Sequence, residues 1–306
     1  MLYLKDIMHP SPYLSVIIPS YRQARTICHE LATLRNYFSK TLPSYEIILV
    51  IDGNDDGTFE KVVKTIAFPE LHIECFEYNQ GKGAAVRHGF QVAQGELIAF
   101  MDAGGDLKAD DLTHMINEMQ TSQADIVIGS KRHMSSHVSY PRLRRVYSYC
   151  YQLLNRMLFK MEIRDTQVGM KLFRRDVLQT MLPLLTIKRF AFDLELLVVA
   201  HHLGFHRIIE APITIRHQFS SSVSWRSIYQ ILWDTLAIFY RSRILKSYDL
   251  SSRTPLPTAS TFSPIMITQT KSLHLSTPLE RKHTPDDFLY THDGLAQKEI
   301  PRKVSA

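Results

Sequence analysis

Short apolar runs alternate with longer stretches of mixed apolar and polar residues over the first 250 positions of the chain. Five of the runs are rich in β-branched and aliphatic residues and close on Gly, Pro, Asp or Asn, which is typical of strands. They cover residues 14–18, 46–51, 72–76, 97–101 and 125–128. Strands that alternate with helical segments predict an α/β fold with a mostly parallel sheet flanked by helices.

The segments that follow these strands are expected to converge on one edge of the sheet. They are residues 19–22, 52–58, 79–83 and 102–106. Ligands of open α/β sheets bind outside the carboxyl ends of the strands, so this edge is the predicted site. The first strand-to-helix turn, 15–26, contains no glycine, which argues against a dinucleotide fingerprint. Residues 81–83 also lack the Ser or Thr that completes a phosphate loop of the ATPase type.

Composition sets the class of protein and its division into segments. With 306 residues, of which 45% are hydrophobic, the chain can form a substantial core. Its three cysteines are too few for a disulfide framework or a zinc site made of cysteine pairs. No run of about 18 apolar residues and no signal-peptide pattern is found, so we expect a cytoplasmic protein that is not secreted. Residues 251–306 are rich in Ser, Thr and Pro, and we expect a disordered tail after a domain at 1–250.

Charged residues mark two candidate sites. The formal net charge is +6, and residues 131–145 contain five basic residues and no acid. Such a run is either a solvated face or a site for an anion. Asp52 and Asp102 directly follow strands, where a carboxylate can bind a ribose hydroxyl or a divalent cation. Asp55 and Asp56 are equally explained as turn formers and helix caps.

Seven motifs, in their order and spacing, are similar to those of family 2 glycosyltransferases of GT-A fold, and within them to the polyprenyl-phosphate sugar transferases. The motifs are SVIIPSY (15–21), VIDGNDDGT (50–58), NQGKGAA (79–85), GELIAFMDA (95–103), GSK (129–131), DTQVGMKLF (165–173) and AFDLELL (191–197). The resemblance covers roughly residues 14–246 and implies a GT-A nucleotide-diphospho-sugar transferase fold. It also implies an enzyme that transfers a hexose with inversion at the anomeric carbon.

For the donor, the resemblance implies a nucleotide sugar, UDP-glucose first and GDP-mannose as the alternative, with no nucleic-acid partner. The implied donor-binding residues are Pro19, Tyr21, Asp52, Gly53, Lys82, Gly83 and Asp102. A divalent cation, Mg²⁺ or Mn²⁺, is expected on Asp102 and Asp106, which are also assigned to catalysis. The chain departs from the family pattern in three places, which read Tyr-Arg-Gln (21–23), Ile-Asp-Gly-Asn (51–54) and Asp-Ala-Gly (102–104).

For the acceptor, the resemblance implies a polyprenyl phosphate. A phosphate monoester is mostly a dianion at neutral pH, so it needs cations to position it more than a base to activate it. Lys131, Arg144 and Arg145 are the candidate cations, whereas Arg132 and Arg142 are interpreted as surface charges. Asp193 and Glu195 are either an acid pair or charges at a helix start.

A lipid acceptor requires contact with a membrane surface. Residues 225–246 combine aromatic and aliphatic side chains with terminal cations, which is typical of an interfacial helix. We therefore expect peripheral association with the cytoplasmic face of a membrane, although a core-packing helix or a dimer surface fits the same pattern. Two other functions stay open: a transferase for soluble acceptors and a nucleotide-sugar-binding relative without turnover.

Overall fold

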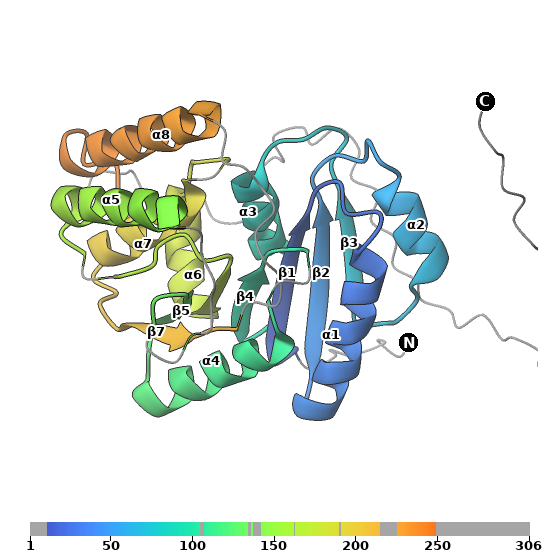
Figure 1. Cartoon of the computed structure of the whole chain (residues 1–306). Helices are drawn as coiled ribbons and strands as arrows, with labels where there is room; N and C mark the ends of the chain where they lie inside the picture. Colours follow the sequence, from blue (N-terminus) through green and yellow to red (C-terminus); the bar gives the residue numbers. More distant parts are fainter. Residues whose placement is uncertain are drawn as a thin grey trace, which may run out of the picture. The chain divides into compact units, whose positions relative to one another are not determined.

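The fold is seen in a computed structural model of the whole chain (Figure 1). The structure describes residues 11–104, 107–133, 136, 142–161, 163–189, 191–214 and 225–248, with the side chains of 142–148 and 225–228 left out. The tail at 251–306 lies outside the described residues, so the domain boundary at residue 250 stays a prediction.

A seven-stranded sheet in the order β3-β2-β1-β4-β6-β5-β7 forms the centre of the fold. Its strands are β1 (Leu14–Ser20), β2 (Tyr45–Ile51), β3 (Leu71–Cys75), β4 (Leu97–Met101), β5 (Ile126–Ser130), β6 (Met170–Arg174) and β7 (Ile208–Pro212). Strand β6 runs antiparallel to β4 and β5, and the other neighbours are parallel. The α/β prediction is confirmed, and the five predicted strands correspond to β1–β5. The strands β6 and β7 were not predicted.

Helices cover both faces of the sheet (Figure 1). One face packs against α1 (Ile27–Thr41), α2 (Thr58–Thr65) and α4 (Ala109–Ser122). The other packs against α3 (Lys82–Val92), α6 (Arg175–Met181), the 3₁₀ turn η1 (Leu182–Leu184) and α7 (Phe192–His202). Helices α5 (Arg142–Phe159) and α8 (Trp225–Arg243) lie over α7, away from the sheet (Figure 1). Alternate strand residues enter opposite cores, as Ile17 and Ile18 of β1 do.

Strand order determines where a ligand can approach the sheet. The chain runs from β1 outward to β2 and β3, and then returns to place β4 on the other side of β1. Ligands of open α/β sheets bind in a crevice at such a change of direction, which lies here between the carboxyl ends of β1 and β4. Tyr21 follows β1 and Asp102 follows β4, so both residues lie at that crevice.

Helix α3 lies unusually close to β1 because Gly89 faces the sheet. A Cβ atom at this position would lie 2.4 Å from Cγ2 of Ile17, which is too short for two carbon atoms. Since Ile17 is fully buried, it has no open space into which to move.

Replacing Gly89 by alanine is expected to lower the free energy of unfolding by about 1–3 kcal/mol, because an extra methyl group overpacks the core. Urea denaturation measures the change. The control is Gln91→Ala on the exposed side of the same helix, which adds no atom to the core. Equal urea midpoints for the two variants would contradict this prediction, because they would show that the packing of α3 against β1 at Gly89 does not contribute to stability.

Candidate functional site

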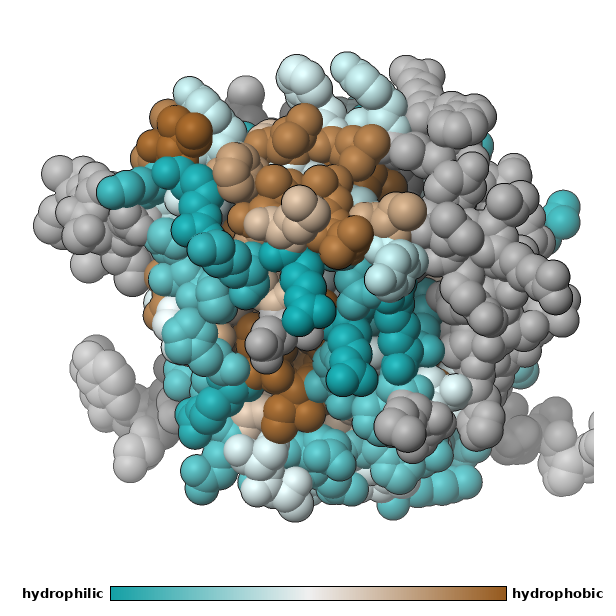
Figure 2. All heavy atoms as spheres, turned by 60° about the vertical axis from the view of Figure 1, so that its left-hand side comes forward, coloured by the Kyte–Doolittle hydropathy of each residue, from teal (hydrophilic) through white to brown (hydrophobic). Residues whose placement is uncertain are grey.

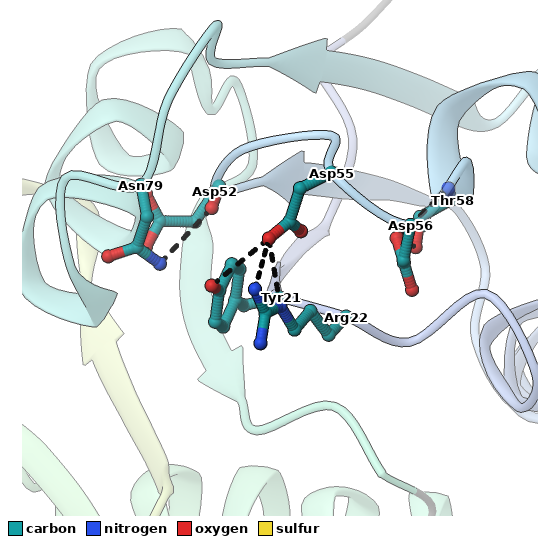
Figure 3. Close-up of polar contacts among 7 residues, drawn as sticks. All are labelled: Tyr21, Arg22, Asp52, Asp55, Asp56, Thr58 and Asn79. Carbon is teal, nitrogen blue, oxygen red and sulfur yellow. Dashed lines mark hydrogen bonds and ion pairs between the residues drawn. The ribbon is translucent and has the colours of Figure 1, made fainter.

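Asp52, at the end of β2, fastens the loop that precedes α3 (Figure 3). Its carboxylate is 3% exposed and accepts hydrogen bonds from the backbone N–H groups of Gln80 (2.7 Å) and Gly81 (2.9 Å) and from the Asn79 side chain (3.0 Å). Burial raises the pKa of Asp52, and the hydrogen bonds oppose this effect. Gly53 permits the approach, because a Cβ there would lie 2.8 Å from the Asn79 nitrogen.

A second contact joins the loops after β1 and β2 (Figure 3). The Arg22 guanidinium donates two hydrogen bonds to one Asp55 oxygen, at 2.6 and 2.8 Å, and the Tyr21 hydroxyl lies 3.3 Å from the same oxygen. Hydrogen bonding to Arg22 lowers the pKa of Asp55. Asp56 has a different role, since it accepts the N–H groups of Ala24 and Thr58 where α2 begins. The turn interpretation therefore describes Asp56.

Four charged side chains form a continuous cluster beneath the carboxyl end of β4. Lys82, the first residue of α3, places its Nζ 2.7 Å from Asp102 Oδ1 and 3.0 Å from Asp193 Oδ2. The other oxygen of Asp193 lies 2.5 Å from Nζ of Lys171, in β6. We call Asp102, Lys82, Asp193 and Lys171 the charge cluster.

The charge cluster runs from the buried Lys171 and Asp193 to the half-exposed Asp102, and its two positive and two negative charges balance. Asp193 and Lys171 side chains are 4% and 0% exposed. Burial lowers the pKa of Lys171. For Lys82 the burial effect is outweighed by Asp102 and Asp193, which raise its pKa. For Asp193 burial is outweighed by the two lysines, which lower its pKa. Each buried charge is stable here because a partner of opposite sign touches it.

Asp102 is held from the side of β6. Its backbone N–H donates to the carbonyl of Gly169 at 2.8 Å, and its carboxylate lies directly over Gly169. A Cβ at position 169 would be 1.9 Å from Asp102 Oδ2. Two positions further on, Gly104 has a φ of 126° and its N–H donates to Glu30 at 2.9 Å. Gly104 therefore brings no carboxylate to the site, and Asp106 lies outside the described residues.

The remaining predicted residues lie at several places around this edge. Lys131 follows β5, and its backbone N–H donates to Asp165 at 3.0 Å. Arg144 and Arg145 lie in the first turn of α5, with side chains outside the described residues, as is that of Arg142. Pro19 lies within β1. A Cβ on Gly83 would meet the Ile187 carbonyl at 2.7 Å, which places Gly83 at a close contact between α3 and the segment before α7.

Asp193 and Glu195 do not act as a pair. While Asp193 joins the charge cluster, the buried Glu195 accepts the N–H groups of Thr186 (2.9 Å) and Ile187 (2.8 Å) and the Tyr248 hydroxyl (3.0 Å). Sequence reasoning also missed Lys171. The sequence did hold a signal for it. Lys171 is the one charged residue in the run Met-Lys-Leu-Phe, whose other residues are apolar, as in a buried strand.

Comparison with known proteins identifies the family. The family model described as Glycosyl transferase family 2 matches residues 15–182. The chain belongs to glycosyl transferase family 2. The predicted enzyme class, a glycosyltransferase of this family, is thereby confirmed.

Individual relatives and solved structures agree with this assignment. A dolichyl-phosphate beta-glucosyltransferase of Trichomonas vaginalis is 31% identical over 243 residues, covering 76% of this chain and 75% of that protein. The human dolichyl-phosphate beta-glucosyltransferase is 31% identical over 221 residues, 67% of each chain. A solved structure of mannosyl-3-phosphoglycerate synthase from Rubrobacter xylanophilus has a TM-score of 0.60 at 14% identity, with 82% and 80% of the two chains covered.

The glucosyl-3-phosphoglycerate synthase of Mycobacterium tuberculosis, solved with Mn²⁺, UDP and phosphoglyceric acid, has a TM-score of 0.59 at 16% identity, with 74% of this chain and 78% of that one covered. These similarities confirm the predicted GT-A fold for this glycosyltransferase. Within the described part of the chain, none of the helices is long and apolar enough to cross a membrane.

Replacing Gly169 by alanine is expected to displace the Asp102 carboxylate, because the new methyl group needs the space that Oδ2 fills. A misplacement of this size lowers kcat/KM for glycosyl transfer about 100-fold. The melting temperature should fall as well, because the new methyl group would also lie 2.2 Å from Cγ and 2.8 Å from Cβ of Asp102, so the whole side chain must move.

Gly204→Ala is the matched control for this substitution. Gly204 follows α7, has a φ of 86° and has no atom within 4 Å of a built Cβ. The control should therefore lower stability through backbone strain and leave kcat/KM unchanged. Normal activity of the Gly169→Ala variant would contradict the account of Asp102.

Proposed function

We propose that this glycosyltransferase moves glucose from UDP-glucose to a polyprenyl phosphate of the dolichyl type, with inversion at the anomeric carbon. The proposal is supported by the similarity to dolichyl-phosphate beta-glucosyltransferases over two thirds or more of the chain. The observation that carries it in the structure is the position of Asp102 and Lys82, a carboxylate and an ammonium at the switch point of the sheet. A nucleoside diphosphate suits such a pair when the ammonium contacts it directly and the carboxylate contacts it through a divalent cation.

The leaving nucleoside diphosphate gains negative charge as the sugar departs. Lys82 is the first residue of α3, and its ammonium lies 2.7 Å from Asp102, where it can stabilise an anion bound at the end of β4. This stabilisation acts on the transition state more than on the bound donor, which is the condition for catalysis.

A divalent cation fits the residues present. The Asp102 side chain is 44% exposed at the strand end, and Mg²⁺ commonly takes one or two carboxylates together with substrate phosphates and water. Within the described residues there is no group of three His, Cys, Asp or Glu side chains that could hold a metal alone. Asp102, with Asp106 as the proposed second ligand, would hold the cation, which supplies further neutralisation of the diphosphate.

The acceptor phosphate attacks through an oxygen that is already deprotonated near neutral pH, so no general base is assigned. The acceptor phosphate and the donor diphosphate are both negatively charged and repel each other, so cations are needed to hold the acceptor close to the donor. The proposed cations are Lys131, Arg144 and Arg145, of which arginine can hold a phosphate through two parallel hydrogen bonds. Lys131 directly follows β5, and Arg144 and Arg145 lie in the first turn of α5, the next helix along the chain.

Two helices offer a surface for the membrane that carries such an acceptor. Helix α5 exposes Tyr149, Leu153 and Met157, and α8 exposes Tyr229, Leu232, Trp233, Leu236 and Tyr240. The helices are joined by a 2.9 Å hydrogen bond between Tyr151 and Thr235. The apolar area is visible in Figure 2, which brings this side of the molecule forward.

The composition of this surface supports a lipid partner. Four of its eight apolar side chains are aromatic, the type that is enriched at the boundary of headgroups and acyl chains. Arg243 at the C-terminal end of α8 and Lys246 soon after it are exposed and can contact anionic headgroups. Peripheral association through α5 and α8 is therefore part of the proposal.

The test of the transfer reaction supplies radiolabelled UDP-glucose or GDP-mannose with polyprenyl phosphate and Mg²⁺ or Mn²⁺. We expect label from UDP-glucose in organic-extractable lipid, and its loss on adding EDTA. Asp102→Asn should abolish transfer, whereas the matched control Asp110→Asn, which alters an exposed ion pair on α4, should retain it. Label only from GDP-mannose would change the sugar, and donor binding without any transfer would refute the proposed reaction.

The acceptor assignment predicts a selective kinetic defect. Replacing Arg144 and Arg145 together by alanine should raise KM for the lipid phosphate about tenfold, because two phosphate contacts are lost. KM for UDP-glucose should stay unchanged. Steady-state kinetics with one substrate varied at a time distinguishes the two, and a defect confined to the donor would refute the assignment.

The membrane assignment predicts that glutamate on the exposed face of α8 prevents lipid binding. Trp233→Glu with Leu236→Glu should abolish co-sedimentation with vesicles of phosphatidylcholine and phosphatidylserine, because burying a carboxylate in lipid is costly. Transfer to a short water-soluble prenyl phosphate should persist. Val92→Glu, at the exposed end of α3, is the matched control. Unchanged sedimentation of the double variant would refute the docking surface.

A further inference from the structure

Lys171 has an environment that its strand alone does not explain. It lies in β6, opposite Phe100 of β4, and is 0% exposed. Its ammonium touches two oxygens, Asp193 Oδ1 at 2.5 Å and the Val168 carbonyl at 2.7 Å. A buried ammonium costs several kcal/mol unless it is paired, and an apolar residue would fill the same space without that cost.

The two oxygens of Asp193 are divided between two lysines. One oxygen pairs with Lys171, and the other lies 3.0 Å from Lys82. Lys82 then places the same ammonium 2.7 Å from Asp102. Both lysine nitrogens also lie 5.2 Å from the centre of the Phe100 ring, one contact shared by the two cations. The position of Lys82 is thus determined by a balance between Asp193 and Asp102.

Removing Lys171 would upset this balance. Two carboxylates would then compete for one ammonium, and the more deeply buried Asp193 gains more from it, because attraction between charges is stronger away from water. Asp193 is 4% exposed and Asp102 is 44% exposed. Lys82 would be drawn toward Asp193 and away from Asp102.

We propose that Lys171 is a positioning residue of the donor site: by neutralising one oxygen of Asp193, it leaves Lys82 oriented toward Asp102 and toward the diphosphate of the donor. Lys171 touches neither substrate and acts through Asp193 and Lys82. This inference rests on the proposed function, because that function places the nucleotide at Lys82.

The test is a double-mutant cycle on UDP binding, measured by calorimetry with Mg²⁺ present and without any turnover. Lys171→Met should weaken UDP binding about tenfold when Lys82 is present, and less than about twofold in the Lys82→Met background. A purely structural role of Lys171 would produce the same loss in both backgrounds. Lys188→Met is the matched control, since it also replaces a lysine by methionine. Lys188 is exposed, and its side chain is not among the partners of the charge cluster.

A variant that fails to fold does not prevent the test. Lys171→Met with Asp193→Asn leaves no unpaired buried charge and removes the carboxylate that competes with Asp102 for Lys82. This double variant should therefore bind UDP within about twofold of the unaltered protein, and a loss of about tenfold would refute the role of Lys171. If the unaltered protein binds no UDP, the proposed nucleotide site is wrong and this inference falls with it. If the protein binds UDP but the loss is absent, or equal in both backgrounds, the role of Lys171 is refuted while the proposed function stands.

Discussion

A lysine ammonium shielded from water must touch a negative charge, and the proposed donor site of this glycosyltransferase is arranged around that requirement. Lys171 needs Asp193, Asp193 has a second oxygen to satisfy, and Lys82 supplies the cation that reaches from it to Asp102. The four residues come from β4, β6 and the first turns of α3 and α7. The charge cluster therefore holds two helices and two strands in one relative position, at the crevice where the sheet changes direction.

Some of this arrangement was readable from the sequence and some was not. Four of the five predicted strands, β1, β2, β4 and β5, are buried apolar runs with a clear end, and only β3 is half-buried. The strands that were not predicted carry residues that break such a run, Lys171 in β6 and Glu210 and Pro212 in β7. Asp52, Lys82 and Asp102 were placed at one edge because they follow strands. What a carboxylate touches depends on segments distant in the chain. Asp52 turned out to fasten a loop, and Asp193 and Glu195, two positions apart, belong to different networks.

A second network, made of hydrogen bonds, joins residues 186–188, which precede α7, to the end of α8, the helix proposed to meet the membrane. Glu195 holds the backbone of Thr186 and Ile187 and accepts the hydroxyl of Tyr248, which follows α8. Two residues beyond Thr186, the carbonyl of Lys188 accepts the N–H of Ala84 in α3 at 3.1 Å. The contacts run without a gap from the end of α8 to the first turn of α3, where Lys82 lies. The proposed donor site and the helix proposed to face lipid are thus built on one packed core. A constant separation between them would suit an acceptor phosphate that reaches the sugar from a bilayer.

The central claim is that the nucleotide diphosphate binds at Asp102 and Lys82, and a crystal structure of the protein with UDP and Mn²⁺ tests it most directly. We expect the diphosphate between the carboxyl end of β4 and the first turn of α3, with the ion on Asp102 and Lys171 still paired with Asp193. Density for UDP away from this crevice, or a diphosphate that touches neither Asp102 nor Lys82, would contradict the account.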